Sequence, residues 1–417
     1  MTTLPVPLGL KKSFGFGDRL GLATPGHLAA ATRFDFAPIF AQQSIREMSR
    51  TQRTPLEVIR AAQTALERLG YQKPWGADAA HLKTATDVDQ TAAAGFGFFT
   101  IDPSAFVCNQ ADRMPAAELE TQLAQMEADG VFAERAWRDH YLAAPFEVAD
   151  GLTLRFSRES LSRGAVKYGR AIAHSERLGQ HIARACAGRP FEIEVSVDET
   201  DSPTSPLEHL FFGLELRRRR LAVVSLAPRF VGEFEKGIDY RGDLARFEAT
   251  LREHAAVARF CGPYKLSVHS GSDKFAVYPI LGRVCGDLLH VKTAGTSYLE
   301  ALRVVARRAP GLFAEIAAYC RGRFETDRQS YHISTTTTEI ARLPGFTDAR
   351  HEADYLDERV GRQLLHVTFG SVLTQGRDAK GRAFRESILE VLQNHAALHE
   401  ELLREHFVKH LSLLSQG

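Results

Sequence analysis

Short apolar runs alternate with helix-like segments along most of this chain. Four such runs lie between residues 191 and 298, and each ends in polar residues before a segment with helical periodicity. Short β-like runs separated by helices are typical of parallel βα units. The pattern therefore predicts four consecutive strands, within FEIEVSVDET, RLAVVSLAPRF, YKLSVHSGSDK and LLHVKTAGTSY.

Four more strand-like segments precede residue 105. We expect the first at residues 20–24 after a glycine-rich loop, the second at 37–43, the third within KPWGADAAHLKT and the fourth within GFGFFTIDPS. A helix starting at Thr54, with Pro55 and Glu57 in the positions that favour a helix N-terminus, follows the second. Eight parallel strands are what a closed (β/α)8 barrel requires.

Two segments do not fit the βα alternation. Residues 105–190 contain two helical stretches around a hairpin signal at Asp150-Gly151, and the chain beyond residue 310 is mostly helical. The sequence thus predicts an α/β fold, a TIM-type barrel in one barrel-based domain over 1–417. Its parts are strands 1–4 in 13–104, a helical and hairpin insertion at 105–190, strands 5–8 in 191–310 and a helical extension at 311–417.

Charge and composition exclude several classes of partner. The chain has 52 Lys and Arg against 51 Asp and Glu, so no overall basic field favours nucleic acid or an anionic membrane. No apolar run approaches the roughly eighteen residues that cross a bilayer, and the five cysteines show no CxxC pairing. We expect a cytoplasmic protein with a small-molecule partner, and the periodic C-terminal segment could mediate a homo-oligomer.

The strand ends carry the candidate chemistry, because in a parallel barrel they all meet at one face. Asp198 and Glu199 end one run, and neighbouring residues of a strand point to opposite faces unless the backbone turns. One carboxylate could bind a metal while the other transfers a proton; a plain surface turn is the alternative. His269 and His290 lie near the ends of two other runs, so Glu199, His269 and His290 form a plausible ligand set, with Glu233 as a fourth.

The neighbouring loops suit a small polyhydroxylated anion. Arg229 can hold a carboxylate by a bidentate fork. Small hydroxyls and two lysines follow the two histidines, at Ser270, Lys274, Lys292 and Thr293. Lys292 could also be a Schiff-base lysine, although nearby metal ligands would favour a Lewis-acid route.

Long blocks of the sequence resemble the tagaturonate epimerase family. The similarity extends over nearly the whole chain, with little shared in the 105–190 insertion. It implies interconversion of D-tagaturonate and D-fructuronate by inversion at C4, and a divalent cation, for which Zn, Mn, Ni, Co and Fe are all plausible. The blocks that carry it are SFGFGDRLGLATPGH, FAQQSIREMSRT, GADAAHLKT, FFTIDPS, EVSVDET, SLAPRFVGEFEKGIDYRGD, GPYKLSVHSGSDKF, HVKTAGTSYLEALR and RQLLHVTFGSVL.

The implied reaction constrains the roles of these residues. The C4 proton of a 2-ketose is not acidic, because C4 is β to the carbonyl, so we expect retro-aldol cleavage of C3–C4 and re-formation of the bond on the other face. Asp198 is the candidate base and Asp273 a second acid or base. His81, Arg229, Ser270, Lys274, Lys292 and Thr293 are candidates for binding the substrate carboxylate and hydroxyls.

Other functions remain open at the level of the sequence. A metal-dependent aldolase or ketose isomerase acting on sugar acids would use a similar ligand set on the same barrel. A non-catalytic sugar-acid binding protein would bind without turnover, and the density of proton-transfer groups at the strand ends argues against it.

Overall fold

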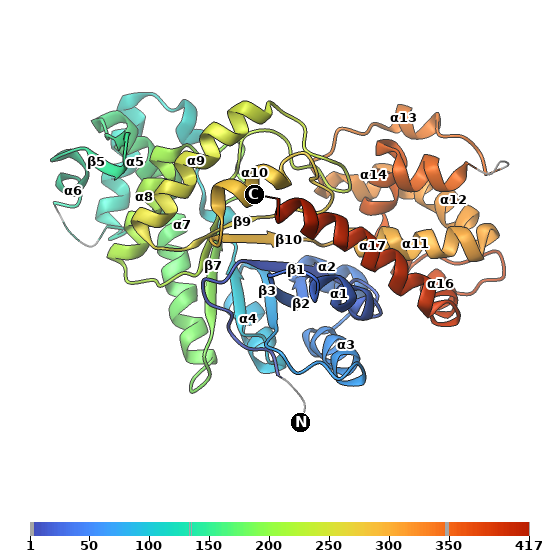
Figure 1. Ribbon diagram of the computed structural model, residues 1–417. Helices are drawn as coiled ribbons and strands as arrows, with labels where there is room; N and C mark the ends of the chain where they lie inside the picture. Colours follow the sequence, from blue (N-terminus) through green and yellow to red (C-terminus); the bar gives the residue numbers. More distant parts are fainter. Residues whose placement is uncertain (1–3, 133, 135, 347–349, 417) are drawn as a thin grey trace.

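Eight parallel strands form a closed barrel at the centre of the molecule (Figure 1). The computed structural model describes residues 4–132, 134, 136–346 and 350–416. The order around the barrel is β1-β10-β9-β8-β7-β4-β3-β2, so consecutive βα units lie side by side. The insertion separates β4 from β7 along the chain, but the two strands pair in the barrel. The barrel strands are β1 (Ser13–Gly17), β2 (Ala37–Ser44), β3 (Gly76–Leu82), β4 (Phe98–Ile101), β7 (Glu192–Ser196), β8 (Ser225–Ala227), β9 (Lys265–Val268) and β10 (Leu289–Lys292).

The first strand lies earlier than the sequence pattern predicts. The glycine-rich segment is itself β1, whereas residues 20–23 form a bend that leads into a helix starting at Thr24. Gly17 is required by close packing, because a Cβ atom there would lie 2.6 Å from the carbonyl oxygen of Thr293. Leu20 and Leu22 are apolar because they pack against the core of the helical extension. The other seven strands lie in the segments expected for them.

Helices follow the barrel strands and cover the outside. The N-terminus of α3 is the expected one, with Thr54 accepting a hydrogen bond from the Glu57 backbone N–H and Glu57 bonding back in a capping box. The helices of the barrel are α1 (Thr24–Ala31), α2 (Ile45–Thr51), α3 (Pro55–Arg68), α4 (Ala85–Ala94), α8 (Pro206–Arg218), α9 (Leu244–Cys261), α10 (Tyr278–Cys285) and α11 (Thr296–Arg308).

The insertion and the extension lie on opposite sides of the barrel (Figure 1). The insertion contains η1 (Ser104–Phe106), η2 (Asn109–Arg113), α5 (Ala116–Ala128), α6 (Asp139–Leu142), the hairpin β5 (Phe146–Ala149) and β6 (Leu152–Leu154), and the long α7 (Arg158–Ala185). The extension contains α12 (Pro310–Asp327), η3 (Arg328–Ser330), α13 (Thr337–Ala341), η4 (Ala353–Asp357), α14 (Arg359–Val367), α15 (Phe369–Thr374), α16 (Phe384–Asn394) and α17 (Ala396–Leu414).

The C-terminal segment is two helices, because α16 ends before His395 and α17 begins after it. Helix α17 runs back across the barrel and packs on α1, α10 and α11 (Figure 1). Its Phe407 enters the same apolar core as Phe14 and Phe16 of β1. A second core lies within the extension, between α11, α12 and α14 to α16.

Charged and polar side chains fill much of the barrel interior. Alternate residues of a strand share one face. The charged residues on the inward faces include Glu192 and Glu194 of β7, Lys265 of β9 and Lys292 of β10. All four are at most 5% exposed. Apolar residues are more usual in such a barrel.

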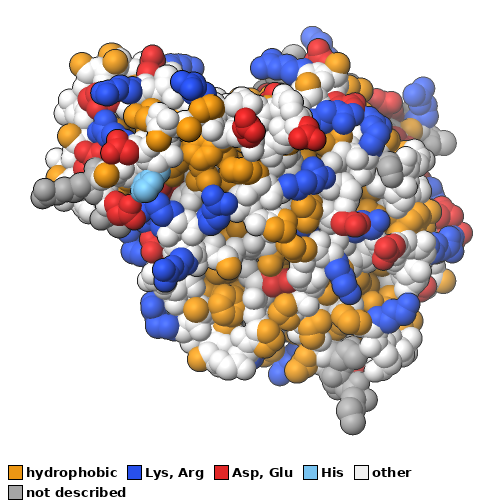
Figure 2. Space-filling model, turned by 60° about the vertical axis from the view of Figure 1, so that its left-hand side comes forward, with side chains coloured by type: hydrophobic (Ala, Val, Ile, Leu, Met, Phe, Trp, Pro, Cys, Tyr) orange, Lys and Arg blue, Asp and Glu red, His pale blue; other side chains and the backbone are white. Residues whose placement is uncertain are grey.

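Within the part of the chain that the structure describes, no helix is long and apolar enough to cross a membrane. On the face shown in Figure 2, Lys and Arg side chains alternate with Asp and Glu side chains. This mixture agrees with the nearly balanced charge of the sequence.

Candidate active site

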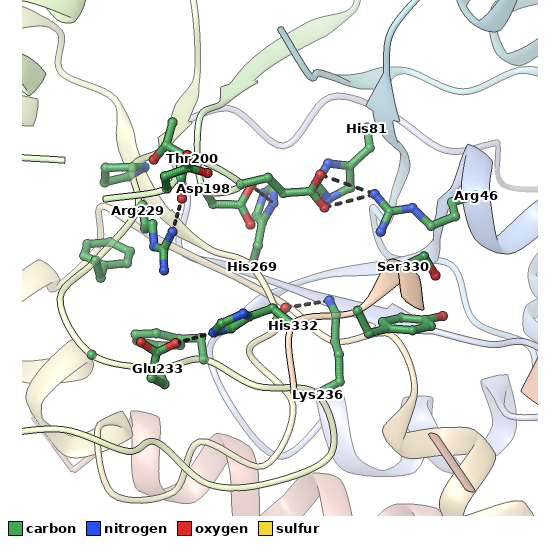
Figure 3. A pocket seen from close by; sticks show the side chains of 18 residues that line it. Arg46, His81, Asp198, Thr200, Arg229, Glu233, Lys236, His269, Ser330 and His332 are labelled. Atoms are coloured by element: carbon green, nitrogen blue, oxygen red, sulfur yellow. Dashed lines mark hydrogen bonds and ion pairs between the residues drawn. The ribbon is translucent and has the colours of Figure 1, made fainter. Parts of the chain in front are cut away.

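A cavity of about 760 Å³ opens at the carboxyl ends of the barrel strands (Figure 3). Its walls come from β3, from the loops after β7, β8 and β9, from α2, and from the segment after η3 in the extension. Active sites of barrel enzymes lie at this end of the barrel. The lining residues are Arg46, His81, Asp198, Glu199, Thr200, Asp201, Pro228, Arg229, Phe230, Gly232, Glu233, Phe234, Lys236, His269, Ser270, Ser330, Tyr331 and His332.

Three residues of this lining form a group of possible metal ligands. One ligand atom of each of His81, Asp198 and His269 lies within 4.8 Å of the others. The Nδ1 atom of His269 lies 3.3 Å from Oδ1 of Asp198, and the two imidazole rings meet edge to face with centroids 4.9 Å apart. Two imidazoles and a carboxylate suit a borderline divalent cation.

Strand geometry explains why Asp198, and not Glu199, joins the histidines. Glu194, Ser196 and Asp198 lie two residues apart at the end of β7, so their side chains face the barrel axis together. Ser196 Oγ donates a hydrogen bond to Asp198. Glu199 is not part of this group and forms an ion pair with Arg46, at 3.0 Å. The carboxylate that we expected to be the ligand is therefore held by an arginine.

A backbone irregularity brings His81 to the group. The register between β3 and β4 shifts between Ala79 and Leu82, and His81 has a φ of +56°. Such a bulge redirects a side chain that strand alternation would point elsewhere. Ser270, directly after His269, also has a positive φ, of +51°. Strained conformations of non-glycine residues cluster at functional sites.

Each histidine has a carboxylate behind it. Oδ2 of Asp102 lies 3.2 Å from Nδ1 of His81, and Oε1 of Glu194 lies 2.7 Å from Nε2 of His269. Ligating histidines usually engage a carboxylate or carbonyl through their other nitrogen, which fixes the ring and its tautomer. The donor set and its supporting carboxylates therefore fit a divalent cation.

The same contacts set the charges of these groups. Burial alone would raise the pKa of Asp198, but the adjacent His269 and His81 hold it well below its usual value. Burial opposes a charge on His269, yet the neighbouring Asp198 and Glu194 carboxylates raise its pKa to about 9. The pKa of Asp102 is likewise depressed, by His81 and Ser104, against the effect of burial.

Two cations of the cavity have no carboxylate partner among the described residues. Arg229 donates to the carbonyl of Thr200 and forms no ion pair, and Lys236 donates to Ser270 Oγ at 2.5 Å. Burial lowers the pKa of Lys236, and the nearby Glu47 offsets this in part. The cavity therefore offers positive charge to an anionic ligand.

Several residues that the sequence suggested lie outside this cavity. His290 is buried within the barrel, where its Nδ1 lies 2.9 Å from Ser13 Oγ. Thr293 donates to the Gly15 carbonyl and thereby joins β10 to β1. Lys274 donates to the backbone carbonyls of residues 235, 238 and 272. Asp273 lies in a different cluster, with Arg362, 2.8 Å away, and His406, 3.0 Å away.

Two more of the suggested residues lie at the margins of the cavity. Lys292 reaches it from below, and its ammonium group already donates to Thr100 and contacts Asp78 and Glu194 at 2.7 and 2.8 Å. Burial opposes its charge, yet the two carboxylates raise its pKa, so it stays protonated. Glu233 stands at the rim, where its carboxylate lies 3.1 Å from His332. Among the described residues, Glu233 is not part of the group of possible metal ligands formed by His81, Asp198 and His269.

Sequence reasoning did not identify all of the lining. Ser330, Tyr331 and His332 come from the extension, and Arg46 from α2; no local motif marks them. Asp102 could be predicted, because it is the polar residue that ends its strand. The indication for Glu194 was weaker: it is a charged residue at an inward position of an otherwise apolar strand.

These features define a (β/α)8-barrel protein with a polar pocket at the carboxyl ends of its strands that contains a group of possible metal ligands. The sequence matches the tagaturonate epimerase family over residues 1–414. The chain therefore belongs to the tagaturonate epimerase family.

Two relatives of known name are similar to this chain over nearly all of its length. The chain is 42% identical over 414 residues to the tagaturonate/fructuronate epimerase of Thermotoga maritima, a match that covers 98% of this chain and 82% of the relative. The native crystal structure of the fructuronate-tagaturonate epimerase from Cohnella laeviribosi has a TM-score of 0.91 and 38% identity, covering 99% of this chain and 83% of that one. A glycerol complex of the same enzyme aligns equally well, with a TM-score of 0.91.

Proposed function

We propose that this protein is a divalent-metal-dependent epimerase that inverts C4 of a 2-keto-hexuronate and interconverts D-tagaturonate and D-fructuronate. The observation that carries the proposal is the approach of His81, Asp198 and His269 to within 4.8 Å, in a cavity with two unpaired cations. The relatives whose names state this activity align over nearly the whole chain. His81, Asp198 and His269 would hold the cation.

A bound dication would strengthen the attraction of the cavity for an anionic substrate. Four carboxylates line it against three Arg and Lys side chains and His269, whose pKa is raised to about 9, so the lining alone is close to neutral in charge and a dication makes it positive. Arg229 is the group best suited to the substrate carboxylate, because its guanidinium has no ion-pair partner among the described residues and can form a bidentate contact.

Inversion at C4 requires cleavage and re-formation of the C3–C4 bond. Breaking this bond converts C4 into an aldehyde and leaves a C2–C3 enediolate, and the aldehyde must turn its other face before the bond re-forms. A bound divalent cation supplies Lewis-acid stabilisation of the negative charge on the C2 and C3 oxygens. The protein must also remove a proton from the C4 hydroxyl and return one to the new alkoxide.

Lys236 is the side chain that we assign to one of these two proton transfers. It lines the cavity, donates a hydrogen bond to Ser270 Oγ, and has a pKa lowered by burial, which favours proton transfer from its ammonium group. On the segment from the extension, Tyr331 and His332 offer a phenol and an imidazole for the other transfer. Asp273, expected in this role, faces the other cluster, and Asp198 is occupied with the two histidines.

Product analysis tests this proposal. Protein stripped with a chelator and protein reloaded with a divalent cation are each incubated with D-tagaturonate, and the products are identified by NMR. We expect D-fructuronate from the reloaded protein alone. Three-carbon fragments would indicate an aldolase, an aldose would indicate a ketose isomerase, and bound but unchanged substrate would indicate a binding protein. Full activity after chelation, with no response to added metal, would contradict the metal assignment.

A further inference from the structure

A small pocket of about 60 Å³ lies below the main cavity, towards the barrel axis. Seven residues line both spaces, among them His81, Lys236 and His269, so the two are continuous. Of these two spaces, Gln42, Ser44 and Lys292 border the deep pocket alone, whereas Arg229 borders the outer cavity alone.

Gln42 points into the barrel from β2. It pairs in register with Asp78 of β3, whose side chain reaches Lys292 inside the barrel. Gly15 of β1 makes room for it, because a Cβ atom there would lie 3.0 Å from Cγ and 3.2 Å from Oε1 of Gln42. The neighbouring Gln43 pairs in register with Ala79, and by strand alternation its side chain lies on the opposite face of β2.

The amide of Gln42 is a polar group without a full set of partners. The residue is 4% exposed, and its Oε1 atom receives no hydrogen bond within the described part of the chain. Buried polar groups usually have a partner in the protein, in a bound water or in a ligand, so an unpaired acceptor beside a pocket is a place where a ligand donor can bind. Two of the charged groups around it have partners of their own: Arg19 pairs with Glu47 at 2.9 Å, and the Lys292 ammonium has three acceptors.

The size and position of the pocket restrict what can occupy it. At about 60 Å³ against about 760 Å³, it is much smaller than the main cavity, and it has room for a small polar group. Along the cavity, Arg229 comes first, His81 and His269 lie at the junction, and Gln42 comes last. A linear sugar acid with its carboxylate at Arg229 and its central oxygens at the junction would extend its other end into the pocket.

We propose that the deep pocket binds the terminal hydroxymethyl group of a ketose acid, with the C1 hydroxyl donating a hydrogen bond to Oε1 of Gln42. This inference rests on the proposed function and adds the orientation of the substrate. Gln42 is then a specificity-determining residue, because it distinguishes a hydroxymethyl ketone from a methyl ketone.

Substrate analogues test this orientation on the metal-loaded protein. We expect kcat/KM for D-tagaturonate to exceed that for its 1-deoxy analogue by about ten- to a hundredfold, since one buried hydrogen bond is lost. Gln42→Leu should lose this discrimination by slowing only the parent substrate, whereas Gln43→Leu, on the other face of the same strand, should retain it. Equal use of both substrates by the unmodified protein would overturn the proposal, as would undiminished discrimination in Gln42→Leu.

Two further measurements keep the test decisive. If Gln42→Leu fails to fold, Gly15→Ala should reduce the discrimination by displacing the amide, and unchanged discrimination would count against the proposal. If D-tagaturonate is not epimerised at all, the proposed function fails. Calorimetric binding of the parent and 1-deoxy compounds then tests the pocket separately, and equal affinities would refute it.

Discussion

The Nε2 atom of His269 lies 2.7 Å from the Oε1 atom of Glu194, inside a barrel where Glu194 is fully buried. This contact leaves Nδ1 of His269 facing Asp198 at the base of the cavity. The ring is therefore oriented from below by a carboxylate that itself contacts Lys292, at 2.8 Å.

We expect Glu194→Gln and Asp102→Asn to weaken metal binding without removing it. Each substitution replaces the carboxylate behind one histidine, and loss of such a partner typically lowers metal affinity about ten- to a hundredfold. Competition with a chromophoric chelator measures the affinity. Glu192→Gln is the matched control, because Glu192 lies on the same strand and accepts a hydrogen bond from Gly9 far from the histidines. An affinity unchanged in both variants would refute the supporting role.

The ligand assignment makes a second prediction. His81→Ala and Asp198→Asn should abolish stoichiometric metal binding, because each removes one of three ligands. Glu199→Gln should leave the metal content unchanged, since that side chain is paired with Arg46. Metal analysis of the purified variants by mass spectrometry distinguishes the two sets. If Glu199→Gln lost the metal and His81→Ala still bound it, Glu199 would be the ligand, as the sequence suggested, and His81 would not.

Much of the fold followed from sequence pattern, because βα alternation is a local signal. Apolar runs predicted seven of the eight strands in the correct segments. The predicted position of β1 was wrong, because the glycines of this strand serve close packing and not a turn. Asp198 and His269 were identified because they end strands. His81 joins them only through a bulge, and Tyr331 only through the packing of the extension, so neither role is encoded locally.

Replacing Lys292 should destabilise the fold more than it alters substrate binding. Lys292→Met leaves the buried Asp78 and Glu194 carboxylates without their shared counter-charge, which typically costs about 3–5 kcal/mol. Urea unfolding measures this loss, with the exposed Lys73→Met as a control. Treatment of the unmodified protein with borohydride and substrate should trap no adduct at Lys292, because its ammonium stays protonated between the carboxylates. A trapped adduct would instead support Schiff-base chemistry.

Buried neutral histidines should make the protein sensitive to acid. Burial lowers the pKa of His254 from 6.5 to about 4. Between these values the unfolded chain binds a proton that the folded protein does not, so stability falls as the pH decreases from 6.5 to 4. The contribution of this residue is about 3 kcal/mol over that range. His254→Gln should reduce proton uptake on unfolding at pH 5 by about one, as measured from the pH dependence of urea unfolding. An unchanged slope would contradict the burial of a neutral imidazole.

The proposed inversion at C4 depends on cleavage of the C3–C4 bond of the substrate. The most direct measurement is the epimerisation of D-tagaturonate labelled with deuterium at C4, in ordinary water, with carbon-13 isotope effects determined at C3 and C4. We predict that the product retains the deuterium and that both carbons show an isotope effect. Loss of the C4 deuterium to solvent, or an isotope effect confined to C4, would contradict the account.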